Sequence, residues 1–169
     1  MADAKRKTHF YQNLSVQHLP IRERVIALQK EISQDPNYQG FDYLTLKDGC
    51  QLLEAVPNRT VWEMVISSRL CNKSGNLHGG AAATLMDNLT STSLLTISKP
   101  GFLDAGHVSR TITMSYLRPV PKGSTVRIEC EVHAAGKNTA NLLGKMFVNG
   151  KLAVTCVHDK AVFSSRPKL

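Results

Sequence analysis

The residues best suited to chemistry in this 169-residue chain lie in one short segment, from Asn72 to Asn88. Within it, His78 is followed by two glycines and three alanines, so a predicted helix opens with almost no side-chain bulk. The first amide groups of a helix lack intrahelical partners and lie at the positive end of its dipole. Such a terminus suits an anion or a developing oxyanion. Close packing of the helix against another element is the alternative explanation for the small residues.

Asp87 is the second unusual residue, because it lies between Met86 and Leu89 in the helix that we expect to be most buried. Carboxylates are rarely buried without a partner or a function. A hydrogen bond to backbone, or a solvent-facing stripe shared with Asn88, would explain it without catalysis. A general base for hydrolysis is the functional interpretation.

The spacing of Gly79 and Asp87 limits how they can cooperate. They are eight residues apart, which corresponds to ~12 Å along a helix axis. A carboxylate side chain cannot span that distance within one chain. If both groups act on one carbonyl, the carboxylate must come from a second, antiparallel copy of the helix.

The histidines give no metal-site signal. Neither His78 with Asp87 nor His107 with Asp104 has the His-x-x-x-His type of spacing, so no metal site is predicted. We expect His78 to hold the loop before the helix. The nucleophile elbow Gly-x-Ser-x-Gly and the phosphate-binding Gly-x-x-x-x-Gly-Lys-Ser/Thr motif are both absent from the sequence.

Two regions are expected along the chain. Residues 1–40 are predicted to be an N-terminal extension, in which an amphipathic helix starts after Pro20 and stops before Asp35-Pro36. Its apolar residues recur at helical spacing, at Ile21, Val25, Leu28 and Ile32. Residues 41–169 are predicted to form the main domain.

The main domain combines one long helix with strands. The helix is predicted at residues 79–97, and the strands at 50–56, 60–67, 108–117, 125–135, 139–148 and 151–163. Strict alternation along 125–135 indicates a half-buried strand, and alternation along 108–117 sets Ser109 on the face opposite Ile112. A helix with so little charge must be covered. We therefore predict an α+β hotdog fold, an antiparallel sheet of about six strands wrapped around one central helix, with an extra N-terminal helix.

Charge is concentrated in the last third of the chain. The formal net charge is +8, and residues 99–169 carry eleven Lys/Arg against four Asp/Glu. A solvated basic surface, nucleic acid, an anionic membrane and a small polyanionic ligand are the possible explanations. The basic residues occur singly along strands without interleaved aromatics, so nucleic acid is not expected.

Composition also bears on the compartment. The chain is 42% hydrophobic, and no apolar run approaches the ~20 residues of a membrane span. The start has a basic cluster but no secretory signal. The four cysteines form no Cys-x-x-Cys pair, which is typical of a reducing compartment. We expect the cytosol, with the mitochondrion as the alternative.

Several of these residues together resemble the hotdog-fold thioesterases of the phenylacetate-pathway and acyl-CoA thioesterase 13 type. The resemblance covers roughly residues 48–163 and rests on Asn72, His78-Gly79-Gly80, Asp87-Asn88, Val108-Ser109, Tyr116 and Pro119. It implies hydrolysis of acyl-CoA without a cofactor, in a homo-oligomer that is a dimer of dimers. Many relatives carry a histidine two residues before the asparagine, where this chain has Leu70.

The resemblance also implies a role for each site residue. The Gly79 amide would form the oxyanion hole, and Asn72 would polarise the thioester carbonyl or hold its water. From the neighbouring subunit, Asp87 would act as base or nucleophile and Ser109 would orient the water. The residues expected to contact substrate are His78 and Gly80 and, for the coenzyme A phosphates, Arg118, Lys122, Gly136, Lys137 and Asn138.

Two other functions remain open from the sequence. Hotdog hydratases resemble one another in pairing an Asp with a His five residues later, and Thr92 stands at that position here. A non-catalytic module that binds acyl-CoA or a protein partner would not need a carboxylate facing a thioester.

Overall fold

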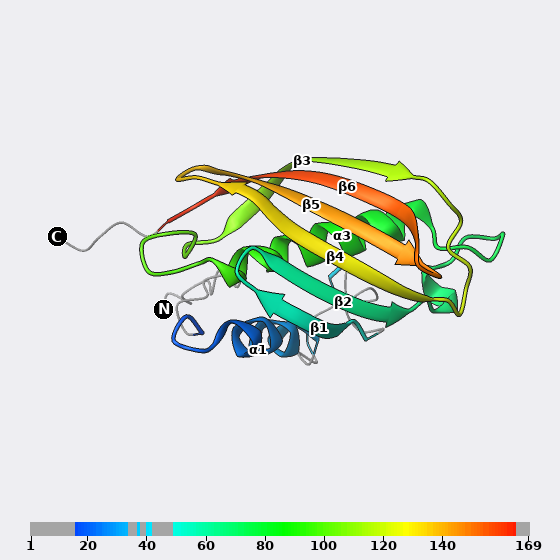
Figure 1. The fold of residues 1–169 in the computed structure, drawn as a ribbon, viewed down its shortest axis with the longest axis horizontal. Coiled ribbons are helices and arrows are strands. Elements are labelled where there is room, and N and C mark those ends of the chain that lie inside the picture. Colours follow the sequence, from blue (N-terminus) through cyan, green and yellow to red (C-terminus); the bar gives the residue numbers. More distant parts are fainter. Residues whose placement is uncertain (1–15, 34–36, 38–39, 42–48, 165–169) are drawn as a thin grey trace, which may run out of the picture.

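One antiparallel sheet and one central helix make up the body of the protein. The computed structural model describes residues 16–33, 37, 40–41 and 49–164. The sheet order is β1-β2-β4-β5-β6-β3, and α3 (Gly79–Ser93) lies against one face of the sheet (Figure 1). The strands are β1 (Gln51–Val56), β2 (Arg59–Val65), β3 (His107–Tyr116), β4 (Thr125–Ala135), β5 (Thr139–Val148) and β6 (Lys151–Val162). This arrangement confirms the predicted α+β architecture.

The central strands follow their sequence pattern. Val126, Ile128 and Cys130 of β4 are all fully buried, as the alternation predicts. β5 and β6 are joined by Asn149 and Gly150, whose φ angles of 50° and 70° are those of the tight turn that Asn-Gly favours. The hairpin therefore sets the register of β6, which carries part of the site described below.

The alternation predicted along β3 is wrong at its start. Ser109 pairs with Lys160, and Ile112 pairs with His158, so the register shifts between Ser109 and Thr111. Directly opposed residues share a face of the sheet. The bulge therefore places Ser109 on the same face as Ile112, toward α3, because one extra residue in a strand reverses the orientation of those beyond it.

The central helix is buried although it contains many hydroxyl side chains. Thr84, Thr90 and Thr92 each donate to the backbone carbonyl four residues earlier, at 2.6–2.9 Å. Their donors are thus satisfied within the helix, which removes most of the cost of burying them. The predicted helix at 79–97 is α3 followed by one 3-10 turn, η3 (Leu94–Thr96).

Close approach of α3 to the sheet depends on Gly144 of β5. A Cβ atom there would lie 2.7 Å from Met86 Sδ and 3.0 Å from Thr90 Cγ2. A side chain at this position would therefore force Met86 and Thr90 to shift.

The helix predicted after Pro20 is α1 (Ile21–Ser33), with Val25 and Leu28 buried. Arg24 Nη1 donates to the carbonyls of Leu95 and Ser98, both at 2.9 Å, and so ties α1 to the chain just beyond α3. The predicted stop before Asp35-Pro36 and most of the junction at residues 37–40 lie outside the described residues. Within the described ranges, no helix has the length and hydropathy needed to cross a membrane.

Candidate active site

The start of α3 is capped by the side chain of His78. Its Nδ1 accepts from the Gly80 N–H at 3.0 Å, so His78 is the N-cap of the helix. A first helical residue has no intrahelical acceptor for its N–H. His78 takes the Gly80 N–H, and the Gly79 N–H is the donor at the first position of the helix.

Packing within the chain does not require glycine at position 79. A Cβ atom built there would meet the Tyr116 ring at 3.4 Å, an ordinary contact. At Gly80 the same atom would lie 3.2 Å from His78 Nδ1, which is tight. Of the two explanations for the small residues, approach of a ligand is therefore favoured at Gly79 and local packing at Gly80.

The side-chain oxygen of Asn72 stabilises the loop before the helix. Its Oδ1 accepts from the backbone N–H groups of Ser74 and Asn76, at 2.9 and 3.2 Å. This orientation leaves the Nδ2 group as a donor. Leu70, at the edge of this loop, is buried, and its carbonyl accepts from the His78 N–H at 2.8 Å.

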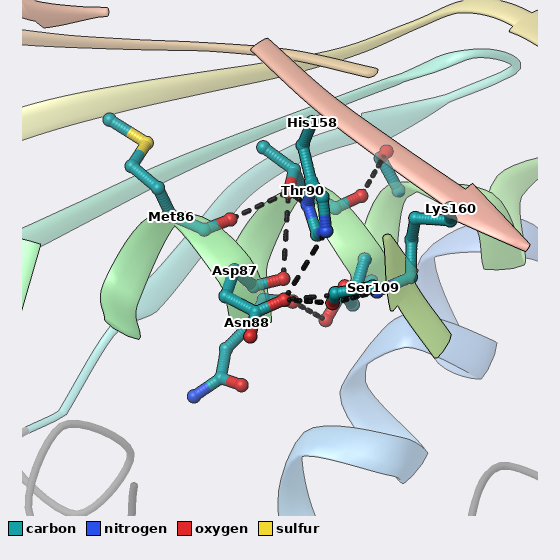
Figure 2. Close-up of polar contacts among 10 residues, drawn as sticks. Met86, Asp87, Asn88, Thr90, Ser109, His158 and Lys160 are labelled. Carbon is teal, nitrogen blue, oxygen red and sulfur yellow. Dashed lines mark hydrogen bonds and ion pairs between the residues drawn. The ribbon is translucent and has the colours of Figure 1, made fainter. Parts of the chain in front are cut away.

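Asp87 is less enclosed than we expected. Its side chain is 44% exposed, whereas Met86 is fully buried. Ser109 donates to Asp87 Oδ1 at 2.8 Å, and two nitrogens lie near the same oxygen, His158 Nε2 at 3.4 Å and Lys160 Nζ at 3.7 Å (Figure 2). Asp87 is therefore held by three side chains from β3 and β6, with one edge open.

The tautomer of His158 follows from its other neighbour. Thr90 donates its hydroxyl proton to the Met86 carbonyl at 2.6 Å, so at 2.8 Å it accepts from His158 Nδ1 (Figure 2). The neutral ring then carries its lone pair on Nε2, which faces Asp87. Burial first, and then the Lys160 charge, lower the pKa of His158 from 6.5 to about 4, despite opposing effects of Asp87 and Asp159.

Lys160 is the second buried base of this cluster. It is 3% exposed, and its ammonium donates to Ser91 Oγ at 2.7 Å and to Ser109 Oγ at 2.9 Å. Burial lowers its pKa from 10.5 to about 8, although Asp87 acts to raise it. The amine is a cation at neutral pH, held between two hydroxyls and a carboxylate.

The lowered pKa values of two histidines, His158 and His107, predict that the fold loses stability in mild acid. The pKa of His107 is lowered to about 3, by burial and then by Lys160 and His158. Between pH 6.5 and about 4, His158 binds a proton in the unfolded chain and not in the folded one, so the unfolding free energy falls as the pH falls. We expect urea unfolding at pH 5 to show a loss of about 1–2 kcal/mol from His158 relative to pH 7.5.

The matched variant for this prediction is His158→Gln, which cannot be protonated. It should show a weaker dependence of the unfolding free energy on pH between 7.5 and 5. An unchanged slope in the variant would contradict the assignment to His158.

Sequence reasoning did not identify His158 or Lys160. A signal was present, because Val154, Cys156, His158, Lys160 and Val162 alternate along β6 and all are buried. Ionisable residues at inward positions of a core strand indicate a partner or a function. The residues of α3 and β3 that face His158 and Lys160 could not be derived from the sequence of β6 alone.

The structure separates the predicted site residues into two groups at opposite ends of β3. Tyr116, at its last position, donates from its hydroxyl to the Gly79 carbonyl at 2.9 Å. Ser109, near its first position, contacts Asp87. Gly79 and Asp87 of one chain therefore lie apart. This agrees with the helix spacing, which predicted that the two residues cannot meet within one chain.

The candidate phosphate-binding residues are separated in the same way. Lys122 donates its backbone N–H to the Gly75 carbonyl at 2.9 Å and so lies by the loop before α3. An Arg118 guanidinium nitrogen donates to the Leu152 carbonyl, at the start of β6. The loop Gly136-Lys137-Asn138 lies at the other end of the sheet, where the Asn138 carbonyl accepts from Val162. No cluster of His, Cys, Asp or Glu suited to a metal occurs among the residues that the structure describes.

Comparison with known proteins gives the same class of fold. The structure is similar to that of zebra fish thioesterase superfamily member 2, with a TM-score of 0.74 and 26% identity, covering 85% of this chain and 99% of that one. A hypothetical thioesterase from Streptococcus pneumoniae, solved with coenzyme A, has a TM-score of 0.63 over 70% of this chain and 92% of that one, at 18% identity. The protein is a hotdog-fold protein, as predicted.

Sequence comparison identifies the family. Residues 74–152 match the model described as "Thioesterase superfamily". Acyl-coenzyme A thioesterase 13 of Mus musculus is 31% identical over 125 residues, which are 72% of this chain and 84% of the mouse protein. The Homo sapiens protein of that name is 33% identical over 64% of this chain and 76% of its own length. The chain belongs to the thioesterase superfamily.

Proposed function

We propose that the protein hydrolyses acyl-CoA thioesters to the free acid and coenzyme A. The observation that carries this proposal is the Asp87 carboxylate, held on one oxygen by Ser109 and open at its other edge, in a chain of the thioesterase superfamily. A carboxylate fixed in this way is suited to take a proton from water. The relatives named acyl-coenzyme A thioesterase 13 support acyl-CoA as the substrate class.

A complete site requires two chains. β3 is an edge strand, and it exposes Val108 and Tyr116 by 52% and 53%. An antiparallel copy paired along this edge buries these side chains. Because its strand runs the other way, it sets the Gly79 end of one chain beside the Asp87 end of the other. We infer a homodimer as the catalytic unit and, from the family resemblance, a dimer of dimers as the assembly.

Each group then has one task in the reaction. The Gly79 N–H and Asn72 Nδ2 donate to the thioester oxygen of a substrate bound at the start of α3. From the other chain, Asp87 takes a proton from water as the water oxygen attacks the carbonyl carbon, with Ser109 fixing the carboxylate. The tetrahedral intermediate collapses by breaking the carbon–sulfur bond. The leaving thiolate takes the proton that Asp87 removed from water, which returns Asp87 to its carboxylate form. These steps balance with water alone and need no cofactor.

The same pairing joins the two candidate phosphate-binding groups. In the antiparallel dimer, Arg118 and Lys122 of one chain approach the loop Gly136-Lys137-Asn138 of the other. Coenzyme A carries several phosphates, which require such cations. We place the protein in a reducing compartment, the cytosol or the mitochondrion, where its four free cysteines would stay reduced.

A panel of short, long and aromatic acyl-CoAs tests the proposal. We expect turnover of at least one class, measured as release of the free coenzyme A thiol. Tight binding without thiol release across the panel would instead indicate a non-catalytic module. A change in enoyl-CoA absorbance without thiol release would indicate a hydratase. At the position where hotdog hydratases have a histidine, this chain has Thr92, whose hydroxyl donates to the Asn88 carbonyl.

A further inference from the structure

Lys160 is a buried cation to which the reaction described above gives no task. It is 3% exposed, whereas the carboxylate beside it is 44% exposed. An ammonium group is rarely buried unless it is paired or has a function. It lies on β6 directly opposite Ser109 of β3, next to the register shift between Ser109 and Thr111. The fold thus sets this amine against a residue of the proposed site.

The directions of the hydrogen bonds around Lys160 follow from its chemistry. An ammonium has three donors and no acceptor, so Ser91 Oγ and Ser109 Oγ both accept from it, at 2.7 and 2.9 Å. Ser109 must then direct its own proton elsewhere. Asp87 Oδ1, at 2.8 Å, is the acceptor. The three side chains form one directed series, from Lys160 through Ser109 to Asp87.

We propose that Lys160 is a positioning residue for hydrolysis, which fixes the Ser109 hydroxyl proton on Asp87 Oδ1 and so presents Asp87 Oδ2 to the attacking water. This inference rests on the proposed thioesterase function. Among the described residues, the side-chain contacts of Asp87 all fall on Oδ1. Without the ammonium, Ser109 is free to rotate its hydroxyl, and the carboxylate loses its fixed orientation.

A purely structural role for Lys160 would predict no dependence of the rate on its charge. The ionisable groups facing it are Asp87 from α3, His107 from β3 and His158 from its own strand. The pKa of Lys160 is lowered to about 8, mainly by burial. A positioning ammonium therefore predicts that kcat falls as the pH rises above 8.

The first test is Lys160→Met, which keeps much of the side-chain volume and removes the charge. We expect kcat to fall by about 10- to 100-fold, the range for a misplaced catalytic group, while KM changes little. The decrease in kcat above pH 8 should disappear in the variant. Lys145→Met is the matched control, because Lys145 lies on β5 outside the site; it should retain kcat and the alkaline decrease.

Ser91→Ala keeps the test decisive if Lys160→Met folds poorly, and a double variant adds a second check where Lys160→Met folds. Ser91→Ala removes one acceptor of Lys160 without touching Asp87 or Ser109, and should lower kcat by a smaller factor at unchanged KM. In the double variant Lys160→Met/Asp87→Asn, the rate should be no lower than in Asp87→Asn alone, because Lys160 acts only through Asp87.

Each outcome separates this inference from the function on which it rests. If the wild type releases no thiol from any acyl-CoA, the proposed function fails. If the wild type is active and Lys160→Met keeps its kcat and alkaline decrease, the positioning role alone is overturned. An acyl group covalently attached to Ser109, found by mass spectrometry during turnover, would also overturn it, since Lys160 would then act as the base for a serine nucleophile.

Discussion

Asp87→Asn is expected to lower acyl-CoA hydrolysis by ~10²-fold or more, the usual contribution of a general base. Asparagine keeps the shape of the side chain and an oxygen that accepts from Ser109, but it cannot take a proton from water. The variant should therefore fold and bind coenzyme A. The measurements are kcat from thiol release, circular dichroism and calorimetric titration with coenzyme A.

The structure adds an internal check on this variant. Asp87 acts to raise the pKa of Lys160, so in Asp87→Asn that pKa should fall further below 10.5, which NMR titration of the lysine side chain would detect. Asp159→Asn is the matched control, since it makes the same change on the outer face of β6, where Asp159 accepts from Asn141 at 2.7 Å. It should remain near wild type. Near-wild-type turnover of Asp87→Asn would remove Asp87 from the mechanism.

Mixing two inactive variants should restore activity if the site is shared between chains. In a mixed dimer of Asn72→Ala and Asp87→Asn, one site inherits both lesions and the other inherits neither. After subunit exchange of equal amounts, about half of the dimers are mixed, so the pool should recover about a quarter of wild-type activity. The measurement is thiol release before and after exchange, with mixed dimers identified by native mass spectrometry.

A second mixture supplies the control. Asp87 and Ser109 of one chain serve the same site, because the structure joins them by a hydrogen bond. Every site in a mixed dimer of Asp87→Asn and Ser109→Ala therefore carries one lesion, and no activity should return. Exchange without recovery in the first mixture would show that each site is built from one chain, against the antiparallel-dimer proposal.

Local pattern in the sequence was enough to predict most of the elements. β4 and β5 begin and end at the predicted residues, and the start of α3 coincides with Gly79. Alternation, helical spacing and the Asn149-Gly150 turn are properties of neighbouring residues, so they can be detected without knowledge of the fold. The separation of Gly79 from Asp87 was equally predictable, since helix geometry sets it.

The surroundings of Asp87 were decided only by the tertiary structure. Ser109 faces α3 because of a bulge that the alternation of its strand did not reveal. His158 and Lys160 lie beside Asp87 because β6, more than sixty residues later in the sequence, is placed between β5 and β3. Contacts of this kind depend on strand order and register, which arise from packing across the whole sheet and leave little trace in any one segment. The sequence alone thus predicted Asp87 and Ser109 as candidate site residues, and the fold decided which side chains contact them.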